Sequence, residues 1–377
     1  MGHEGFHGTS SLLYHIHPPT TVKSVRRVKE IAYEADSDQT LHHRHFLTSR
    51  VKPGGSPTLD RIPLLFNPEI AMLYVEPTTN DEFFYRNAQA DELVYVSKGN
   101  GILESVYGNL EYGEGDYLVI HRGILHRFRM NLEGEQTKLV IFESRGHVRY
   151  PSRYKNDFGQ LIEGAPYSER DIRRPILLEP RDEMGDFPLY VKQYDGINEL
   201  VLDHHPFDVI GWDGYFYPWA FNIRDFEPIV GRVHQPPPVH QTFQARNFVV
   251  CSFVPRKFDY HPLAIPAPYN HSNINSDEVI YYVAGNFMSR RGVDISSFTV
   301  HPAGIPHGPH PGTVEASIGK DATEELAVMI DTFHPLHLTH QAAELEDDRY
   351  PYSWIPPEDG AEHARELSER GPEAFPD

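Results

Sequence analysis

The sequence predicts an all-β protein built from two similar lobes, and three observations lead to this fold class. Short runs rich in Val, Ile, Tyr and Phe recur along the chain, separated by turn residues at the spacing of about 8–12 residues that is typical of antiparallel sandwiches and barrels. Glycine and proline number 28 and 32 among 377 residues, which suits many short strands and turns better than a helical bundle. The third observation is an internal repeat.

The repeat consists of three matched runs in the same order. The run "DELVYVSKGNG" is similar to the later "DEVIYYVAGNF", "GDYLVIHRGILH" is similar to "SSFTVHPAGIPH", and "KLVIFES" is similar to "LAVMIDT". Such agreement indicates that a β-unit has been duplicated. We therefore predict an N-terminal β-sandwich lobe over residues 1–225, with the first repeat at about 63–145, a C-terminal lobe over 226–345 and an extended tail over 346–377. Long loops and a few short helices complete the prediction.

Composition excludes several classes of partner. The formal net charge of −20 argues against nucleic acid and against an anionic membrane surface, since both require clustered Lys and Arg. The single cysteine, Cys251, excludes an internal disulfide framework, and its place in "NFVVCSFV" indicates a buried thiol. No run approaches the roughly 18 apolar residues of a membrane-spanning helix, and the N-terminal stretch has no apolar signal region. We expect a soluble, cytoplasmic protein.

A metal-ligand pattern lies in the second repeat. The chain has 23 histidines, which crowd between His234 and His340. His271 is followed by Glu278, and "PAGIPH" ends at His307. Residues two apart on a strand face the same side, and antiparallel neighbours bring such side chains together. Asp277 is the rival carboxylate, but strand alternation turns it to the opposite face from Glu278.

Each repeat resembles a cupin, a small double-sheet barrel of the jelly-roll type, so the fold class is a bicupin. Asn273 stands where the cupin pattern has its second histidine, which leaves His271, Glu278 and His307 as ligands. Two histidines and one carboxylate with open positions are the ligand set of non-haem Fe(II) oxygenases. The first repeat keeps Glu92 and His126, but Arg86, Asn87 and Ala88 replace its histidine pair. We predict that the first cupin is degenerate and holds no metal.

A more specific resemblance rests on "PYNHSNINSDEV", "GIPHGPHPG", "DVIGWDG", "FNIRDFEPI" and the closing "YSW". These stretches resemble the homogentisate 1,2-dioxygenases, a family of bicupin Fe(II) enzymes of tyrosine breakdown. The resemblance is good over residues 190–335 and weak before them. It implies a small aromatic substrate and O₂ as partners, opening of the homogentisate ring to maleylacetoacetate, and assembly into trimers that pair into hexamers.

The resemblance also implies roles for individual residues. The catalytic histidine falls on His234, with His240 as the competing candidate for the proton-handling role. Substrate contacts fall on Tyr269, His301 and the ligand His307. The family's substrate-contacting Tyr is replaced by Phe287, which removes a hydroxyl and leaves open which aromatic acid is the substrate. We expect Arg290 or Arg291 to anchor its carboxylate.

Two alternative functions remain open from the sequence. The first is another ring-cleaving cupin dioxygenase with a gentisate- or hydroquinone-type substrate. The second is a non-catalytic bicupin that binds a small ligand for storage or sensing. Consumption of O₂ by iron-loaded protein with a panel of dihydroxylated aromatic acids separates the enzymes from the binding protein.

Overall fold

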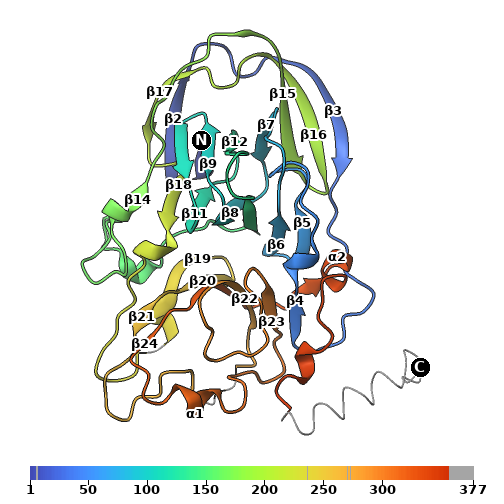
Figure 1. The fold of residues 1–377 in the computed structure, drawn as a ribbon. Helices are drawn as coiled ribbons and strands as arrows, with labels where there is room; N and C mark the ends of the chain where they lie inside the picture. Colours follow the sequence, from blue (N-terminus) through green and yellow to red (C-terminus); the bar gives the residue numbers. More distant parts are fainter. Residues whose placement is uncertain (6, 236, 270, 272, 356–377) are drawn as a thin grey trace.

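The computed structural model describes residues 1–355 except 6, 236, 270 and 272. These residues form two stacked β lobes, with the N-terminal lobe above the C-terminal lobe in Figure 1. The described helices are short, α1 (Thr313–Ser317), α2 (His340–Ala343) and six 3₁₀ turns, and none is long and apolar enough to cross a membrane. The prediction of an all-β bicupin fold with a few short helices is confirmed.

The N-terminal lobe contains two large sheets and a small one. The larger has the order β14 (Ile172–Arg173), β18 (Trp219–Asn222), β11 (Asp116–Ile120), β8 (Asp91–Lys98), β13 (Lys138–Ser144), β6 (Ile70–Val75), β5 (Ile62–Phe66) and β26 (His337–Leu338). The second has the order β10 (Gly108–Tyr112), β9 (Gly101–Ser105), β12 (His126–Met130), β7 (Phe84–Asn87), β15 (Met184–Gln193), β16 (Gly196–His204) and β3 (Val22–Glu30). The small sheet contains β1 (Gly2–Glu4), β2 (His7–His15) and β17 (Val209–Gly214).

The C-terminal lobe is smaller. Its main sheet has the order β19 (Gln241–Ala245), β20 (Phe248–Phe253), β25 (Leu326–Thr332), β22 (Asp277–Ala284), β23 (Phe298–His301) and β4 (Arg44–Phe46). A two-stranded ribbon of β21 (Arg256–Lys257) and β24 (Ala322–Thr323) lies beside it. Cys251 is a free, buried thiol on β20, as predicted.

The predicted repeat has a direct counterpart in strand order. In the N-terminal lobe β8 lies between β11 and β13, and in the C-terminal lobe β22 lies between β23 and β25, all antiparallel. A glycine with positive φ follows each central strand, Gly99 at 85° and Gly285 at 90°. A Cβ on Gly285 would collide with the backbone carbonyl of Glu324, so this turn requires glycine.

Strand alternation decides which side chains face which core. On β8, Leu93 and Tyr95 belong to a core cluster that also contains Val279 and Tyr281 of β22, so the two lobes share one apolar interior. The tyrosine hydroxyl of Tyr281 donates to Ser97 Oγ at 2.7 Å across this junction. The opposite face of β22 packs Ile280 and Tyr282 into a separate small cluster. Because side chains alternate, Glu278 shares this second face, away from the N-terminal lobe.

The two lobes also exchange short strands. β4 comes from the N-terminal part of the chain but pairs with β23 of the C-terminal lobe. β26 comes from the C-terminal part but pairs with β5 of the N-terminal lobe. The domain limits at 225 and 345 stay a prediction. The structure shows in addition that each lobe contributes one short strand to a sheet of the other.

A long connection over residues 146–185 runs along the junction as well. It contains the 3₁₀ turns η2 (Ser152–Tyr154) and η3 (Glu169–Asp171). The hydroxyl of Tyr154 donates to the carbonyl of Gln241 at 2.8 Å, and that of Tyr167 donates to the carbonyl of Thr242 at 2.5 Å. The loop thereby ties the N-terminal lobe to β19.

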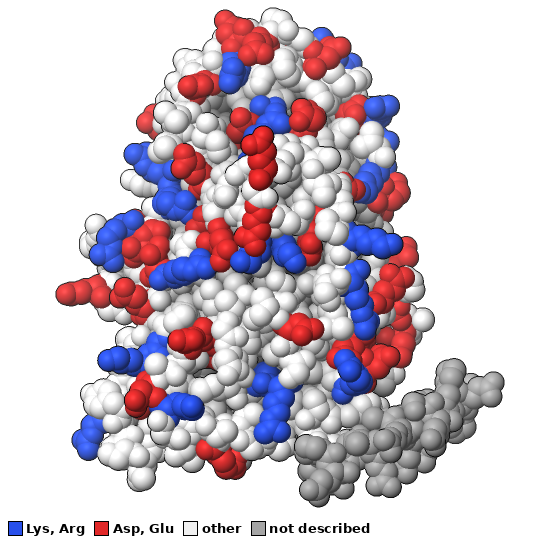
Figure 2. Space-filling model, viewed as in Figure 1, with Lys and Arg blue, Asp and Glu red and all other residues white. Residues whose placement is uncertain are grey.

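Surface charge is mixed on the face shown in Figure 2, where Lys and Arg are interspersed with Asp and Glu. This face has no continuous basic patch among the residues drawn in colour. The prediction that nucleic acid is not a partner stays a prediction.

Candidate metal centre and pocket

The cupin position of the C-terminal lobe brings together a carboxylate and two histidines. Glu278 near the start of β22, His301 at the end of β23 and His307 in the following loop each offer a ligand atom within 4.8 Å of the others. His307 Nε2 lies 3.5 Å from Glu278 Oε2. Two atoms that bind one ion at about 2.1 Å on neighbouring corners lie about 3 Å apart, so this pair is close to a metal-binding arrangement.

Of the two carboxylate oxygens of Glu278, one accepts a hydrogen bond within the protein and the other is available to a metal ion. His301 Nδ1 donates to Oε1 at 2.7 Å, and Arg290 Nη2 approaches the same oxygen at 3.5 Å. Burial disfavours the charged carboxylate, but the hydrogen bond from His301 and the nearby His307 ring outweigh it and hold the pKa of Glu278 well below its usual range. The group is therefore a carboxylate whose Oε2 is free to bind a cation.

His307 is a buried imidazole that forms no hydrogen bond among the described residues, although its Nε2 lies 3.5 Å from Glu278 Oε2. Its residue exposure is 3%, and no hydrogen-bond partner reaches either ring nitrogen among the described residues. A buried polar atom without a partner is costly in a native protein, and a bound metal ion would satisfy it. The donor set therefore fits the predicted ion.

His271 lies farther from this pair. Its Nδ1 donates to the carbonyl of Tyr269 at 2.8 Å, which leaves Nε2 as the potential ligand. Its ring centroid lies 6.3 Å from that of His307, at an interplanar angle of 82°. His271 is exposed and lies in the same pocket as Glu278. Its role as the third ligand stays a prediction, as do the roles of Glu278 and His307.

Asp277, the rival carboxylate, faces the other way. Its two oxygens accept the backbone N–H groups of Ala303 and Leu336, both at 2.6 Å. These bonds anchor the segments that follow β23 and β25. The alternation argument for Glu278 over Asp277 agrees with this geometry.

His301 is fixed on both sides. In addition to its bond to Glu278, its Nε2 accepts from the hydroxyl of Tyr350 at 3.0 Å. Burial, together with Arg290, lowers the pKa of His301 to about 3, so the ring is neutral. His301 is not among the residues that line the pocket, and it orients Glu278 from behind. Its predicted contact with substrate stays a prediction.

A pocket of about 440 Å³ opens beside Glu278. It is lined by eight of the residues singled out from the sequence: His234, His240, Tyr269, His271, Asn273, Glu278, Phe287 and Arg290. Segments that lie far apart in the chain contribute these side chains, which therefore meet only in the folded protein. A volume of this size accommodates a single-ring aromatic acid.

The two candidate proton-handling histidines both line this pocket but differ in environment. His234 is exposed, with its Nδ1 3.9 Å from Asp259 Oδ2 and its ring edge-on to Tyr269 at 5.2 Å. His240 is half-buried, with its ring centroid 4.9 Å from that of Phe253, and desolvation, together with Arg256, lowers its pKa to about 3. A histidine with so low a pKa is a weak base at neutral pH, which favours His234 for proton transfer.

Phe287 and Arg290 follow the Gly285 turn into the pocket wall. The ring of Phe287 packs edge-on against Tyr282 at 4.5 Å, and the residue is 8% exposed. The Arg290 side chain is buried, with Nη1 donating to the carbonyl of Gly308 at 2.8 Å. Its buried Nε has no partner among the described residues. Arg291, the other proposed carboxylate anchor, is exposed and does not line the pocket.

Sequence reasoning missed two residues at this site. The His43 ring lies 5.3 Å from that of His301 and 6.3 Å from that of His307, although His43 belongs to the N-terminal segment that leads into β4. Asp331 on β25 is the cross-strand partner of Glu278 and lines the pocket. Burial and the neighbouring Glu278 raise the pKa of Asp331 to about 7. The repeat alignment itself could have signalled Asp331, because Glu143 of the first repeat matches it.

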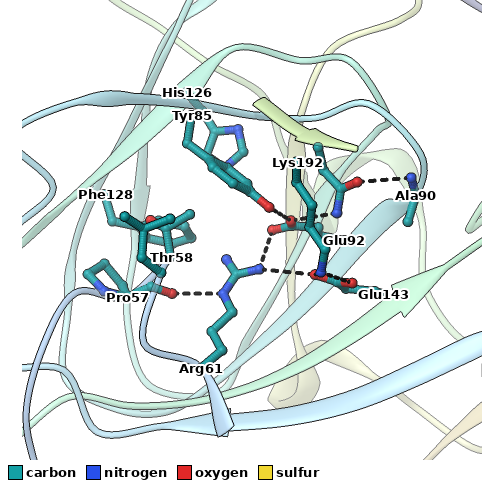
Figure 3. Close-up of polar contacts among 12 residues, drawn as sticks. Pro57, Thr58, Arg61, Tyr85, Ala90, Glu92, His126, Phe128, Glu143 and Lys192 are labelled. Atoms are coloured by element: carbon teal, nitrogen blue, oxygen red, sulfur yellow. Dashed lines mark hydrogen bonds and ion pairs between the residues drawn. The ribbon is translucent and has the colours of Figure 1, made fainter. Parts of the chain in front are cut away.

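The corresponding position of the N-terminal lobe is filled by a cation of the chain itself (Figure 3). Arg61 Nη1 lies 2.9 Å from Glu92 Oε2 and 3.7 Å from Glu143 Oε1. Asn87 Nδ2 donates to Glu92 Oε1 at 3.0 Å. Burial disfavours the charge on Glu92, but Arg61 and His126 outweigh it and lower the pKa of Glu92 to about 2. A guanidinium thus stands beside the cupin glutamate, which supports the prediction that this copy holds no metal.

A second histidine cluster lies elsewhere in the N-terminal lobe, where His3, Asp91 and His121 have ligand atoms within 4.8 Å of one another. Asp91 Oδ2 accepts from His121 Nδ1 at 2.9 Å and from the N–H of Val148 at 3.1 Å. Its Oδ1 accepts from the N–H of Arg122 at 2.8 Å. Both carboxylate oxygens are therefore engaged, and the cluster is a hydrogen-bonded network.

Comparison with known proteins finds relatives of this chain. Residues 68–223 match the family model of the homogentisate 1,2-dioxygenase N-terminal region. A protein of Saccharolobus solfataricus with the name "Putative dioxygenase SSO1533" is 42% identical over 94% of this chain and 92% of its own length. The homogentisate 1,2-dioxygenase of Bradyrhizobium diazoefficiens is 26% identical over 73% of this chain, which spans 63% of that enzyme.

Among solved structures, a cupin 2 conserved barrel domain protein from Leptotrichia buccalis is similar at a TM-score of 0.34 and 12% identity, covering 81% of this chain and 100% of that one. The sequence motifs, the family match and the strong similarity to the Saccharolobus protein lead to one assignment. The chain belongs to the homogentisate 1,2-dioxygenase family.

Proposed function

We propose that this protein is an Fe(II)-dependent ring-cleaving dioxygenase that acts on homogentisate or a closely related dihydroxylated aromatic acid. The observation that carries the proposal is the buried His307, which forms no hydrogen bond among the described residues and lies beside Oε2 of Glu278, a residue that lines the same pocket as His271. Bound by these three residues, Fe(II) would hold a ring oxygen of the substrate and supply electrons to O₂. The products retain both oxygen atoms, so no external reductant is required.

The chain's own residues prepare the substrate. His234, whose Nδ1 lies 3.9 Å from Asp259 Oδ2, takes the proton of a phenolic hydroxyl, which makes the ring electron-rich. Arg290 supports an acidic substrate, because its buried Nε at the pocket wall can donate to a carboxylate. Phe287 presents an apolar wall that excludes water from one side of the ring.

The test of this proposal is O₂ uptake by the iron-loaded protein with homogentisate, gentisate and simpler hydroquinone acids. We expect uptake of one O₂ per ring opened with at least one of them, measured with an oxygen electrode and by loss of the aromatic absorbance. Uptake with gentisate alone would favour the gentisate-type alternative. Iron retention without uptake on any acid would favour the non-catalytic binding protein.

A specificity prediction arises at Phe287. We expect Phe287→Tyr to change the ratio of kcat/KM between homogentisate and gentisate, because a tyrosine hydroxyl in the pocket wall can hydrogen-bond a substrate oxygen whereas phenylalanine cannot. An apolar wall discriminates weakly, by about 10- to 200-fold, whereas loss of a built hydrogen bond costs more. Phe333→Tyr, the same change at an exposed position outside the pocket lining, is the control. An unchanged ratio in Phe287→Tyr would show that residue 287 does not determine specificity.

Assembly into trimers or hexamers and a cytoplasmic location remain proposals that rest on the family resemblance and on composition. Size-exclusion chromatography with light scattering measures the first of them directly.

A further inference from the structure

The internal repeat places a pair of acidic residues at the same point of both lobes. In the N-terminal lobe, Glu92 on β8 lies directly opposite Glu143 on β13. In the C-terminal lobe, Glu278 on β22 lies directly opposite Asp331 on β25. Cross-strand partners have neighbouring side chains on one face of the sheet, so each lobe gathers two carboxylates at the cupin position.

The N-terminal pair forms ion pairs with two cations of the chain. Lys192 Nζ donates to both oxygens of Glu143, at 2.6 and 2.5 Å, and the hydroxyl of Tyr33 donates to Glu143 Oε2 at 2.9 Å. Arg61 forms the ion pair with Glu92 described above. Two buried acids therefore meet two buried cations, as Figure 3 shows.

The C-terminal pair is compensated on one side only. Glu278 has His301, His307 and Arg290 around it. For Asp331, no hydrogen-bond donor reaches the buried Oδ1 among the described residues. The neighbouring cation Arg256 is paired with Glu325 at 3.2 Å. A buried carboxylate oxygen without a donor is costly, and Asp331 lies in the pocket wall, where a ligand can supply one.

We propose that Asp331 determines specificity by accepting a hydrogen bond from a hydroxyl or amino group on the ring of the bound aromatic acid. This role rests on the proposed function, since it assumes that the pocket holds such an acid. The pocket would then recognise the substrate at two points. Asp331 accepts a hydrogen bond from a group on the ring, and Arg290 donates one to the substrate carboxylate. A site built around such a hydrogen bond discriminates strongly against ligands that lack the donor.

Binding measurements test this role without requiring turnover. Homogentisate is titrated calorimetrically into the iron-loaded protein without O₂, alongside 2-hydroxyphenylacetate and 3-hydroxyphenylacetate, each of which lacks one ring hydroxyl. We expect wild type to bind homogentisate more tightly than one of these analogues by on the order of 10- to 100-fold, the cost of leaving one buried polar group without its hydrogen bond. In Asp331→Leu that ratio should fall close to 1, with Asp331→Asn intermediate.

Asp321→Asn is the matched control, because Asp321 is exposed in the same lobe and outside the pocket lining; its ratio should equal that of wild type. Iron content and thermal stability are measured for every variant, and Asp331→Asn decides the question if Asp331→Leu does not fold. An unchanged ratio in the Asp331 variants would overturn the proposal. So would loss of iron from both, since Asp331 would then act on the metal.

The two proposals can fail separately. If wild type binds these acids but consumes no O₂, the dioxygenase function is wrong and the ratio still tests Asp331. If wild type consumes O₂ and the Asp331 variants have the same affinity ratio as wild type, the dioxygenase function holds and the proposed role of Asp331 is wrong. If wild type binds none of the acids, both proposals fail.

Discussion

Replacing His271, Glu278 or His307 by Ala is expected to abolish both iron retention and O₂ uptake. Two remaining protein ligands hold a labile ion such as Fe(II) poorly, and Glu278→Ala also removes the carboxylate that His301 and Arg290 contact. Metal analysis of the purified variants, together with O₂ uptake after reconstitution, measures the effect. Wild type should retain one iron per chain.

The first repeat supplies the matched control for this prediction. Glu92→Gln and His126→Gln change the corresponding residues of the N-terminal lobe, where Arg61 already accompanies the glutamate. We expect both variants to keep the full iron content, although Glu92→Gln weakens a buried ion pair and should lower the melting temperature. Two irons per chain in wild type, or iron that survives Glu278→Ala, would contradict the assignment.

Replacing His234 by Ala is expected to leave iron in place and to lower kcat by about 10²- to 10⁴-fold, as for the loss of a general base. His234 lines the pocket, and its Nδ1 faces Asp259 rather than the Glu278–His307 pair. Steady-state O₂ uptake and iron content, measured on the same preparation, test both parts of this prediction.

His240→Ala is the comparison for this variant. The low pKa of His240, caused by burial and Arg256, makes it a poor proton acceptor at neutral pH, so we expect a smaller fall in kcat than for His234→Ala. Loss of iron with His234 would mean that it is a ligand and that the three ligands are misassigned. Unchanged turnover would transfer the proton-handling role to His240 or to water.

Several features of this protein could be predicted from the sequence because they depend on local periodicity. Alternating apolar residues predicted the strands, and the matched runs predicted that β8 and β22 occupy equivalent places. The spacing of the second repeat selected Glu278 over Asp277, because neighbouring residues of a strand face opposite sides. The family, too, was recognisable from short motifs.

Tertiary structure alone decided the surroundings of the site. β4 pairs with β23, which brings His43 close to His301 and His307 from the opposite end of the chain. Arg61 reaches Glu92 from the position just before β5, so a side-chain cation stands where the repeat would place a metal. The pairing of distant strands depends on the energy of the whole packed sheet. A local sequence pattern therefore does not predict which distant strands pair.

The contrast between the two acid pairs has the same origin. Glu143 and Asp331 are equivalent in sequence, but only Glu143 meets a lysine, because β15 lies parallel to β7 in the second sheet of the N-terminal lobe and carries Lys192 to it. The sequence by itself determined the strands, the duplication and the candidate ligands. Long-range packing decided which of the carboxylates are paired with a cation of the chain and which line a pocket. The reason is that a buried charge is neutralised only by a side chain that the fold brings within a few ångströms of it.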